Sequence, residues 1–189
     1  MNIAIFGDSF ANGETGGEQK LEHLGLTQYL TDDGHLVVNF SRQGNTNYGV
    51  TTDYPFHMRQ NEHLKFDIAL VFGTEPSRST HVWIDNIKSG MSVRDVDTHM
   101  NKEYYELLGE AQSIYNVPIY LIGGVADTLE PSVVEEYDIE CICQSLVNLC
   151  LKGEHTIEEP VKSFVYPLPM FMKEMAEFSK FSFNWRTFN

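Results

Sequence analysis

The chain has 189 residues, of which 42% are hydrophobic and 21% are charged, a composition typical of one globular domain with a real core. It carries 13 Lys and Arg against 27 Asp and Glu, so its formal net charge is −14. That charge disfavours nucleic acids and anionic lipid surfaces as partners. No run of residues is apolar and long enough to span a membrane, and no signal peptide opens the chain, so we expect a soluble protein.

The first half of the chain predicts three strands and one helix. Residues 2–6 form a short apolar run that indicates a buried strand. Apolar residues from Leu21 to Leu30 then predict a helix that closes near Gly34. Two further strands are expected over residues 35–40 and 67–72, and the second of these has the clearest pattern of a strand buried on both faces.

The second half predicts a fourth strand over residues 118–122 and three helices. The helices are expected near residues 97–116, 133–151 and 169–181. We interpret Cys141, Cys143 and Cys150, all in the second of these helices, as apolar filling rather than disulfides or zinc ligands. Because strands alternate with helices, we expect a parallel sheet with helices on both faces, in one α/β domain that covers residues 1–189.

Three polar loops follow predicted strands, at residues 7–13, 41–49 and 73–78. In an open parallel sheet, ligands bind at the carboxyl ends of the strands. We therefore expect these three loops to meet at one crevice, which is the predicted binding site.

The first of these loops opens with Gly7-Asp8-Ser9, directly after the first strand. A serine between a strand and the next helix can present its hydroxyl, and a helix N-terminus stabilises negative charge that develops there. Gly7 would let the chain turn sharply, and Asp8 could cap the helix. The alternative is an ordinary strand–turn–helix in which Ser9 is only a cap.

Gly7-Asp8-Ser9 and the segment from Asn39 to Thr46 resemble the first two sequence blocks of the SGNH, or GDSL-type, hydrolase family. The resemblance implies a three-layer α/β/α sandwich with a mainly parallel, flavodoxin-like sheet. It further implies Ser9 as the catalytic nucleophile, the backbone N–H groups of Ser9 and Gly44 as donors to the oxyanion, and neither a metal nor an organic cofactor. On its own, Gly44 could equally be a simple turn glycine.

The third block departs from the family pattern. The family has an asparagine whose side chain donates to the oxyanion, and Glu75 stands at that position here. A carboxylate repels an oxyanion, and the loss of one such donor typically costs about 10²–10³ in turnover. Arg78 could pair with Glu75 or contact the substrate, and Asn45 or Asn47 could supply the missing donor. The alternative is a helix start with two surface charges.

The fourth block, Asp-x-x-His, does not occur in the chain. His99 has aspartates at the wrong spacing, and His155 lacks an upstream aspartate, so each is more typical of a surface histidine than of a general base. Two explanations stay open. Either the sequence stops before its C-terminal catalytic segment, or the protein is a noncatalytic relative.

The sequence therefore favours a serine esterase that acts on small acyl esters, with O-acetyl groups of carbohydrates as a candidate class. The alternative is a noncatalytic glycan-binding or structural protein, such as a component of a phage virion or tail. For either function we expect a cytoplasmic or virion-associated protein that could assemble as an oligomer or in a virion. Tyr48, Tyr54 and Trp83 could stack on sugars, although core packing is the commoner role of aromatic residues. A nucleotide-binding domain is disfavoured because no Gly-x-Gly-x-x-Gly follows the first strand.

Overall fold

The computed structural model of the chain describes residues 1–8, 11, 26–123, 137 and 139–143. Within these residues, five strands form one sheet in the order β2-β1-β3-β4-β5, and each neighbouring pair is parallel. The strands are β1 Asn2–Phe6, β2 Leu36–Asn39, β3 Ile68–Phe72, β4 Ile119–Ile122 and β5 Glu140–Cys143. This order is that of flavodoxin-like sheets, so the predicted parallel sheet is confirmed.

Burial on both faces explains why the central segments form strands. Every residue of β3 is buried, and so are Ile3 to Phe6 in β1. A strand that is covered on both sides needs an apolar residue at each position, and that pattern predicted these strands. The four strands expected from the sequence begin and end within one residue of the observed bounds.

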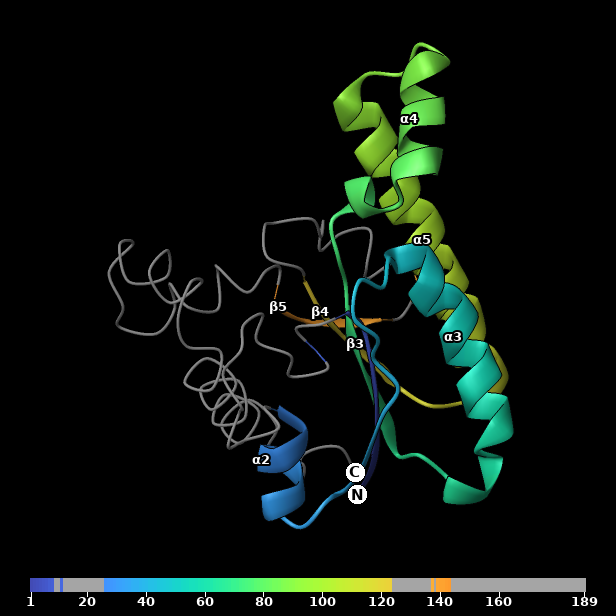
Figure 1. The fold of residues 1–189 in the computed structure, drawn as a ribbon. Helices are drawn as coiled ribbons and strands as arrows, with labels where there is room; N and C mark the ends of the chain where they lie inside the picture. The colour runs from blue at the N-terminus through green and yellow to red at the C-terminus, as the bar shows by residue number, and fades with distance from the viewer. Residues whose placement is uncertain (9–10, 12–25, 124–136, 138, 144–189) are drawn as a thin grey trace, which may run out of the picture.

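Helices cover both faces of the sheet. In Figure 1, α3 Asn47–Gln60 and α5 Val93–Tyr115 lie on one face, and α2 Leu26–Asp32 lies on the other. One buried cluster joins residues of β1, β3 and β4 to α3 and α5, and a second joins the alternate residues of the same strands to α2. The predicted three-layer α/β/α sandwich is therefore confirmed.

The long helix α5 matches the helix predicted over residues 97–116 but begins one turn earlier. It begins at Val93 because the side chain of Ser92 accepts a hydrogen bond from the backbone N–H of Asp95. It ends at Tyr115, because the next residue, Asn116, has a left-handed backbone with a φ of 51°. Helix α2 is the part of the predicted 21–34 helix that the structure describes.

Helix α3 is not predicted by the sequence pattern. Its first turn is capped by Thr46, whose hydroxyl accepts a hydrogen bond from the backbone N–H of Gly49. Its buried residues include the polar Asn47 and Asp53 beside the apolar Val50 and others, so its apolar stripe is interrupted. Those two polar residues belong to the candidate site described below.

Residues 140–143 correct the prediction of a helix over residues 133–151, because they form β5 at the edge of the sheet, paired with β4. Ile139 and Cys141 pack against the core beneath α3 and α5, whereas Ile142 packs against the opposite core. This alternation with a period of two defines a strand. The apolar spacing of the wider segment also suits a helix, which explains the incorrect prediction. The rest of that segment, Cys150 included, and the predicted 169–181 helix lie outside the described residues.

A helical pair extends past the edge of the sheet at which β3 ends. Helix α4 Thr80–Lys88 packs along the first turns of α5, and Figure 1 shows both rising beyond the strands. The indole N–H of Trp83 donates to Asp97 Oδ1 at 2.9 Å and joins the two helices. No residue of α4 is buried. No helix in the described part of the chain is long and apolar enough to cross a membrane.

Candidate active site

The loops that follow β1, β2 and β3 meet at one edge of the sheet. The chain leaves β1 for β2 on one side and later returns to β3 on the other, so the strand order reverses between β1 and β3. That reversal is where open α/β sheets form a ligand crevice. The backbone N–H of Arg42 donates to the carbonyl oxygen of Gly7 at 3.1 Å and joins the first two loops. For the residues described, the predicted convergence is confirmed.

Gly7 directly follows β1, in a position that no larger residue fits. Its φ is 154°, and a Cβ atom there would lie 2.7 Å from Phe72 Cβ and 2.8 Å from Ala11 Cβ. The first loop therefore crosses β3 at close range, which requires glycine. Asp8 follows and is buried with 3% exposure. Ser9, the predicted nucleophile, lies outside the described residues.

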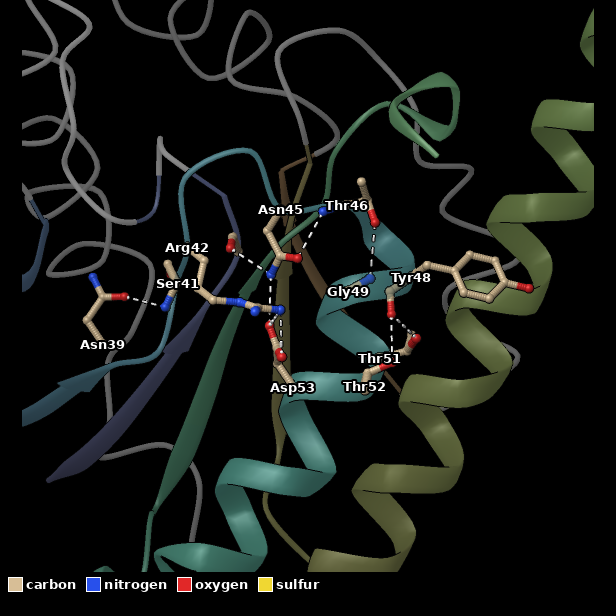
Figure 2. A network of polar contacts seen from close by, with 11 residues as sticks. Asn39, Ser41, Arg42, Asn45, Thr46, Tyr48, Gly49, Thr51, Thr52 and Asp53 are labelled. Carbon is tan, nitrogen blue, oxygen red and sulfur yellow. Dashed lines mark hydrogen bonds and ion pairs between the residues drawn. The ribbon is translucent and has the colours of Figure 1, made fainter. Parts of the chain in front are cut away.

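A buried polar network holds the second loop against the first (Figure 2). The side-chain amide of Asn45 donates to the Gly7 carbonyl at 3.3 Å and to Asp53 Oδ2 at 3.0 Å. Arg42 Nη2 lies 2.6 Å from Asp53 Oδ2 and 2.8 Å from Oδ1. Asn45 and Asp53 are each 8% exposed, so the network fixes the loop to the first turns of α3.

Gly49 and Gly44 make this loop possible in different ways. A Cβ atom on Gly49 would collide with Asn45 Oδ1, so the helix must carry glycine where Asn45 packs on it. Gly44 has a φ of 69° in an exposed turn that the Asn45 N–H closes onto the Arg42 carbonyl at 3.1 Å. A left-handed residue in an exposed turn favours glycine. The role of Gly44 as an oxyanion donor stays a prediction.

Asn47 joins the second loop to the third. Its amide nitrogen donates to the Thr74 carbonyl at 2.9 Å, and its Oδ1 accepts from the Thr74 N–H at 2.7 Å. Both residues are buried. One side chain thus satisfies both backbone groups of a residue in the neighbouring loop, which fixes the distance between the ends of β2 and β3.

An ion-paired arginine joins the third loop to the first. Arg78, in the short 3₁₀ helix η2 Pro76–Arg78, donates from Nη1 to Asp8 Oδ2 at 2.7 Å and from Nε to Glu75 Oε2 at 3.1 Å. The predicted contact of Arg78 with Glu75 is confirmed, whereas the sequence did not indicate the contact with Asp8. The Asp8 side chain is 4% exposed and that of Arg78 is 32% exposed, so the guanidinium reaches from the surface to a buried carboxylate.

The described histidines take no visible part in this site. His99 is exposed on α5, and His57 stacks on Phe40 with ring centroids 4.4 Å apart. Within the described residues, no hydrogen bond or ion pair joins a histidine to the three loops, and no group of three or more His, Cys, Asp and Glu could hold a metal ion. His155 lies outside the described residues.

Three aromatic side chains were candidates for sugar stacking, and the structure separates them. Tyr54 is fully buried, and Trp83 is half-buried at the α4–α5 contact. Tyr48 stays 39% exposed beside the site, and its hydroxyl donates to Glu103 at 2.8 Å. That hydrogen bond, followed by partial burial, raises the pKa of Tyr48, so its phenol stays neutral at physiological pH.

Comparison with known proteins supports the fold. No family model and no curated protein matches the chain in sequence. The lipase Lip_vut3 from a goat rumen metagenome superposes with a TM-score of 0.60 at 16% identity, over 97% of each chain. AlinE4, an SGNH-hydrolase family esterase, gives 0.53 at 18% identity over 98% of this chain and 96% of its own. A mutant of Axe2, an acetyl-xylooligosaccharide esterase from Geobacillus Stearmophilus, gives 0.55 at 17% identity over 94% and 91%. At these identities the likeness establishes the SGNH-hydrolase fold.

Proposed function

We propose that this chain is a carboxylic ester hydrolase with Ser9 as its nucleophile. The observation that carries the proposal is the convergence of its three loops at the edge where the strand order reverses. Gly7, which stands two residues before Ser9, accepts hydrogen bonds from the second loop, and Asp8 is ion-paired to the third. The peptide segment that leads to the serine is thus held on both sides.

The proposed reaction is that of a serine esterase. Ser9 Oγ attacks the ester carbonyl carbon, the new C–O bond forms, and the carbonyl π electrons move onto its oxygen. The serine proton passes to a general base and then to the departing alcohol, which leaves an acyl-enzyme that water hydrolyses. The backbone N–H groups of Ser9 and Gly44 would stabilise the oxyanion. No described histidine is assigned as the base.

The substrate class we favour is a small, uncharged acyl ester, including O-acetyl groups on carbohydrates. The net charge of −14 disfavours anionic esters. Axe2, an acetyl-xylooligosaccharide esterase, shares the fold. The exposed ring of Tyr48 lies on the first turn of α3, next to the loops, where it could pack on a sugar ring.

Turnover of 4-nitrophenyl acetate and of an acetylated xylooligosaccharide tests the proposal. The protein should release acetate from both, and Ser9→Ala should abolish release while the far-ultraviolet circular dichroism stays unchanged. Equal rates for the two proteins would contradict the proposal. Tight binding of the sugar by both proteins without turnover would instead support the noncatalytic alternative.

A further inference from the structure

The site lacks one donor that ester hydrolysis on this fold would use. Glu75 stands at the position of the expected donor, and a carboxylate has no N–H to offer. Its Oε2 instead accepts a hydrogen bond from Arg78. Under the proposed function, we therefore look for a third donor to the oxyanion among the other residues of the three loops.

The two asparagines of the second loop are already engaged. Asn45 donates both N–H groups of its amide, one to the Gly7 carbonyl and one to Asp53. Asn47 donates to the Thr74 carbonyl and accepts from the Thr74 N–H, so its amide plane is fixed along the third loop. The second N–H of Asn47 has no acceptor among the described residues, but it is a neutral donor on a residue that is only 7% exposed, so it is less accessible to a substrate than Arg78 and forms a weaker hydrogen bond.

Arg78 has both the position and the unused donors. Its Nη1 lies 2.7 Å from the carboxylate of Asp8, the residue directly before Ser9. A guanidinium has five N–H donors, and the structure uses one on Nε for Glu75 and one on Nη1 for Asp8. Within the described chain, Nη2 has no acceptor. The side chain is 32% exposed, so a substrate can reach the remaining donors.

We propose that Nη2 of Arg78 donates the third hydrogen bond to the oxyanion, in place of the asparagine amide that the chain lacks. This inference rests on the proposed esterase function. Asp8 and Glu75 bind two other edges of the guanidinium and fix its plane, so that the donor is preorganised before the oxyanion forms. Hydrogen bonds from a charged donor are roughly twice as strong as neutral ones, which suits this role.

The proposal also gives Glu75 a function. A carboxylate close to an oxyanion would oppose catalysis, but here it holds Nε of the arginine that stabilises the negative charge. Glu75 and Asp8 are thus positioning residues that act through Arg78.

Arg78→Met tests the inference, with Arg94→Met, an exposed arginine of α5, as the matched control. With 4-nitrophenyl acetate, Arg78→Met should lower kcat by about 10²–10³ while KM changes little, because the donor acts on the transition state. Arg94→Met should match the wild type. In Arg78→Ala, added methylguanidinium should restore part of kcat, which a purely structural role would not allow.

A second variant covers the case in which Arg78→Met does not fold. Lysine can still pair with Asp8 but lacks the planar fork, so Arg78→Lys should fold and should still lose most of kcat. Full kcat in either variant, or a loss that methylguanidinium does not restore, would overturn the role of Arg78 and leave the esterase proposal intact. A wild-type protein without Ser9-dependent turnover would overturn both.

Discussion

Removal of the Asp53 carboxylate should destabilise the protein far more than removal of its arginine partner. In Asp53→Ala, the Asn45 amide loses its acceptor in a site that is 8% exposed, and a buried unsatisfied donor costs about 1–3 kcal/mol. The Arg42 side chain is 60% exposed and regains water when released, so that ion pair adds less than about 1 kcal/mol. We expect a total loss of about 2–3 kcal/mol in the free energy of unfolding.

Urea unfolding measures this loss. With an m-value of about 2 kcal/mol/M, the midpoint of Asp53→Ala should fall by about 1–1.5 M while m stays constant. Arg42→Met removes the same ion pair but leaves Asn45 and Asp53 hydrogen-bonded to each other, so its midpoint should fall by less than about 0.5 M. Equal shifts in the two variants would refute the reasoning, because they would assign the stability to the exposed ion pair.

Three further predictions concern the rest of the site and core. Asn47→Ala should lower the free energy of unfolding by about 2–3 kcal/mol in the same assay, because it leaves both backbone groups of Thr74 unsatisfied. Gly7→Ala should cost about 1–3 kcal/mol more than Gly34→Ala in thermal or urea unfolding, since both have positive φ but only a Cβ on Gly7 meets core atoms. The Tyr104 hydroxyl is buried without a partner in the described chain, and burial raises its pKa well above 10. A raised pKa means that stability is fully present below about pH 10 and falls above it. Tyr104→Phe, which also removes a buried unsatisfied hydroxyl, should therefore be at least as stable as the wild type at pH 7 and lose less stability at pH 11.

The sequence predicted the sheet well because its strands are buried on both faces. Such strands are continuous apolar runs, and their alternation with helices fixes a parallel topology. At β5, on the edge of the sheet, the apolar pattern does not distinguish a strand from a helix. Residues 140–143 alternate between two cores in a segment whose wider apolar spacing also suits a helix, so only the pairing with β4 distinguishes the two structures.

Helix α3 was not predicted from the sequence, for a related reason. Helix α3 buries Asn47 and Asp53 among its apolar residues, which breaks the periodic pattern on which helix prediction depends. The same two residues build the site, so the feature that hid the helix is part of the proposed function. One signal was available, because Thr46 three residues before Gly49 is a capping residue followed by helix-compatible sequence.

Some features of the site were predictable from the sequence, and others were not. The loops, with Gly7 and Gly44, were predictable because the loops follow strands and the first two match known blocks. The pairing of Asp8 with Arg78 joins residues 70 positions apart, and that of Arg42 with Asp53 joins loop to helix. In the sequence each of these charges looks like a surface residue, and only the folded chain shows that the aspartates are buried.

The most direct test of the central claim is the intact mass of the protein after treatment with a fluorophosphonate. An activated serine displaces fluoride and retains the phosphonyl group, which marks a nucleophile whatever its natural substrate is. We predict a single adduct that maps to the peptide containing Ser9 and is absent from Ser9→Ala. No adduct on the folded wild-type protein, or an equal adduct on Ser9→Ala, would contradict the assignment of Ser9 as the nucleophile.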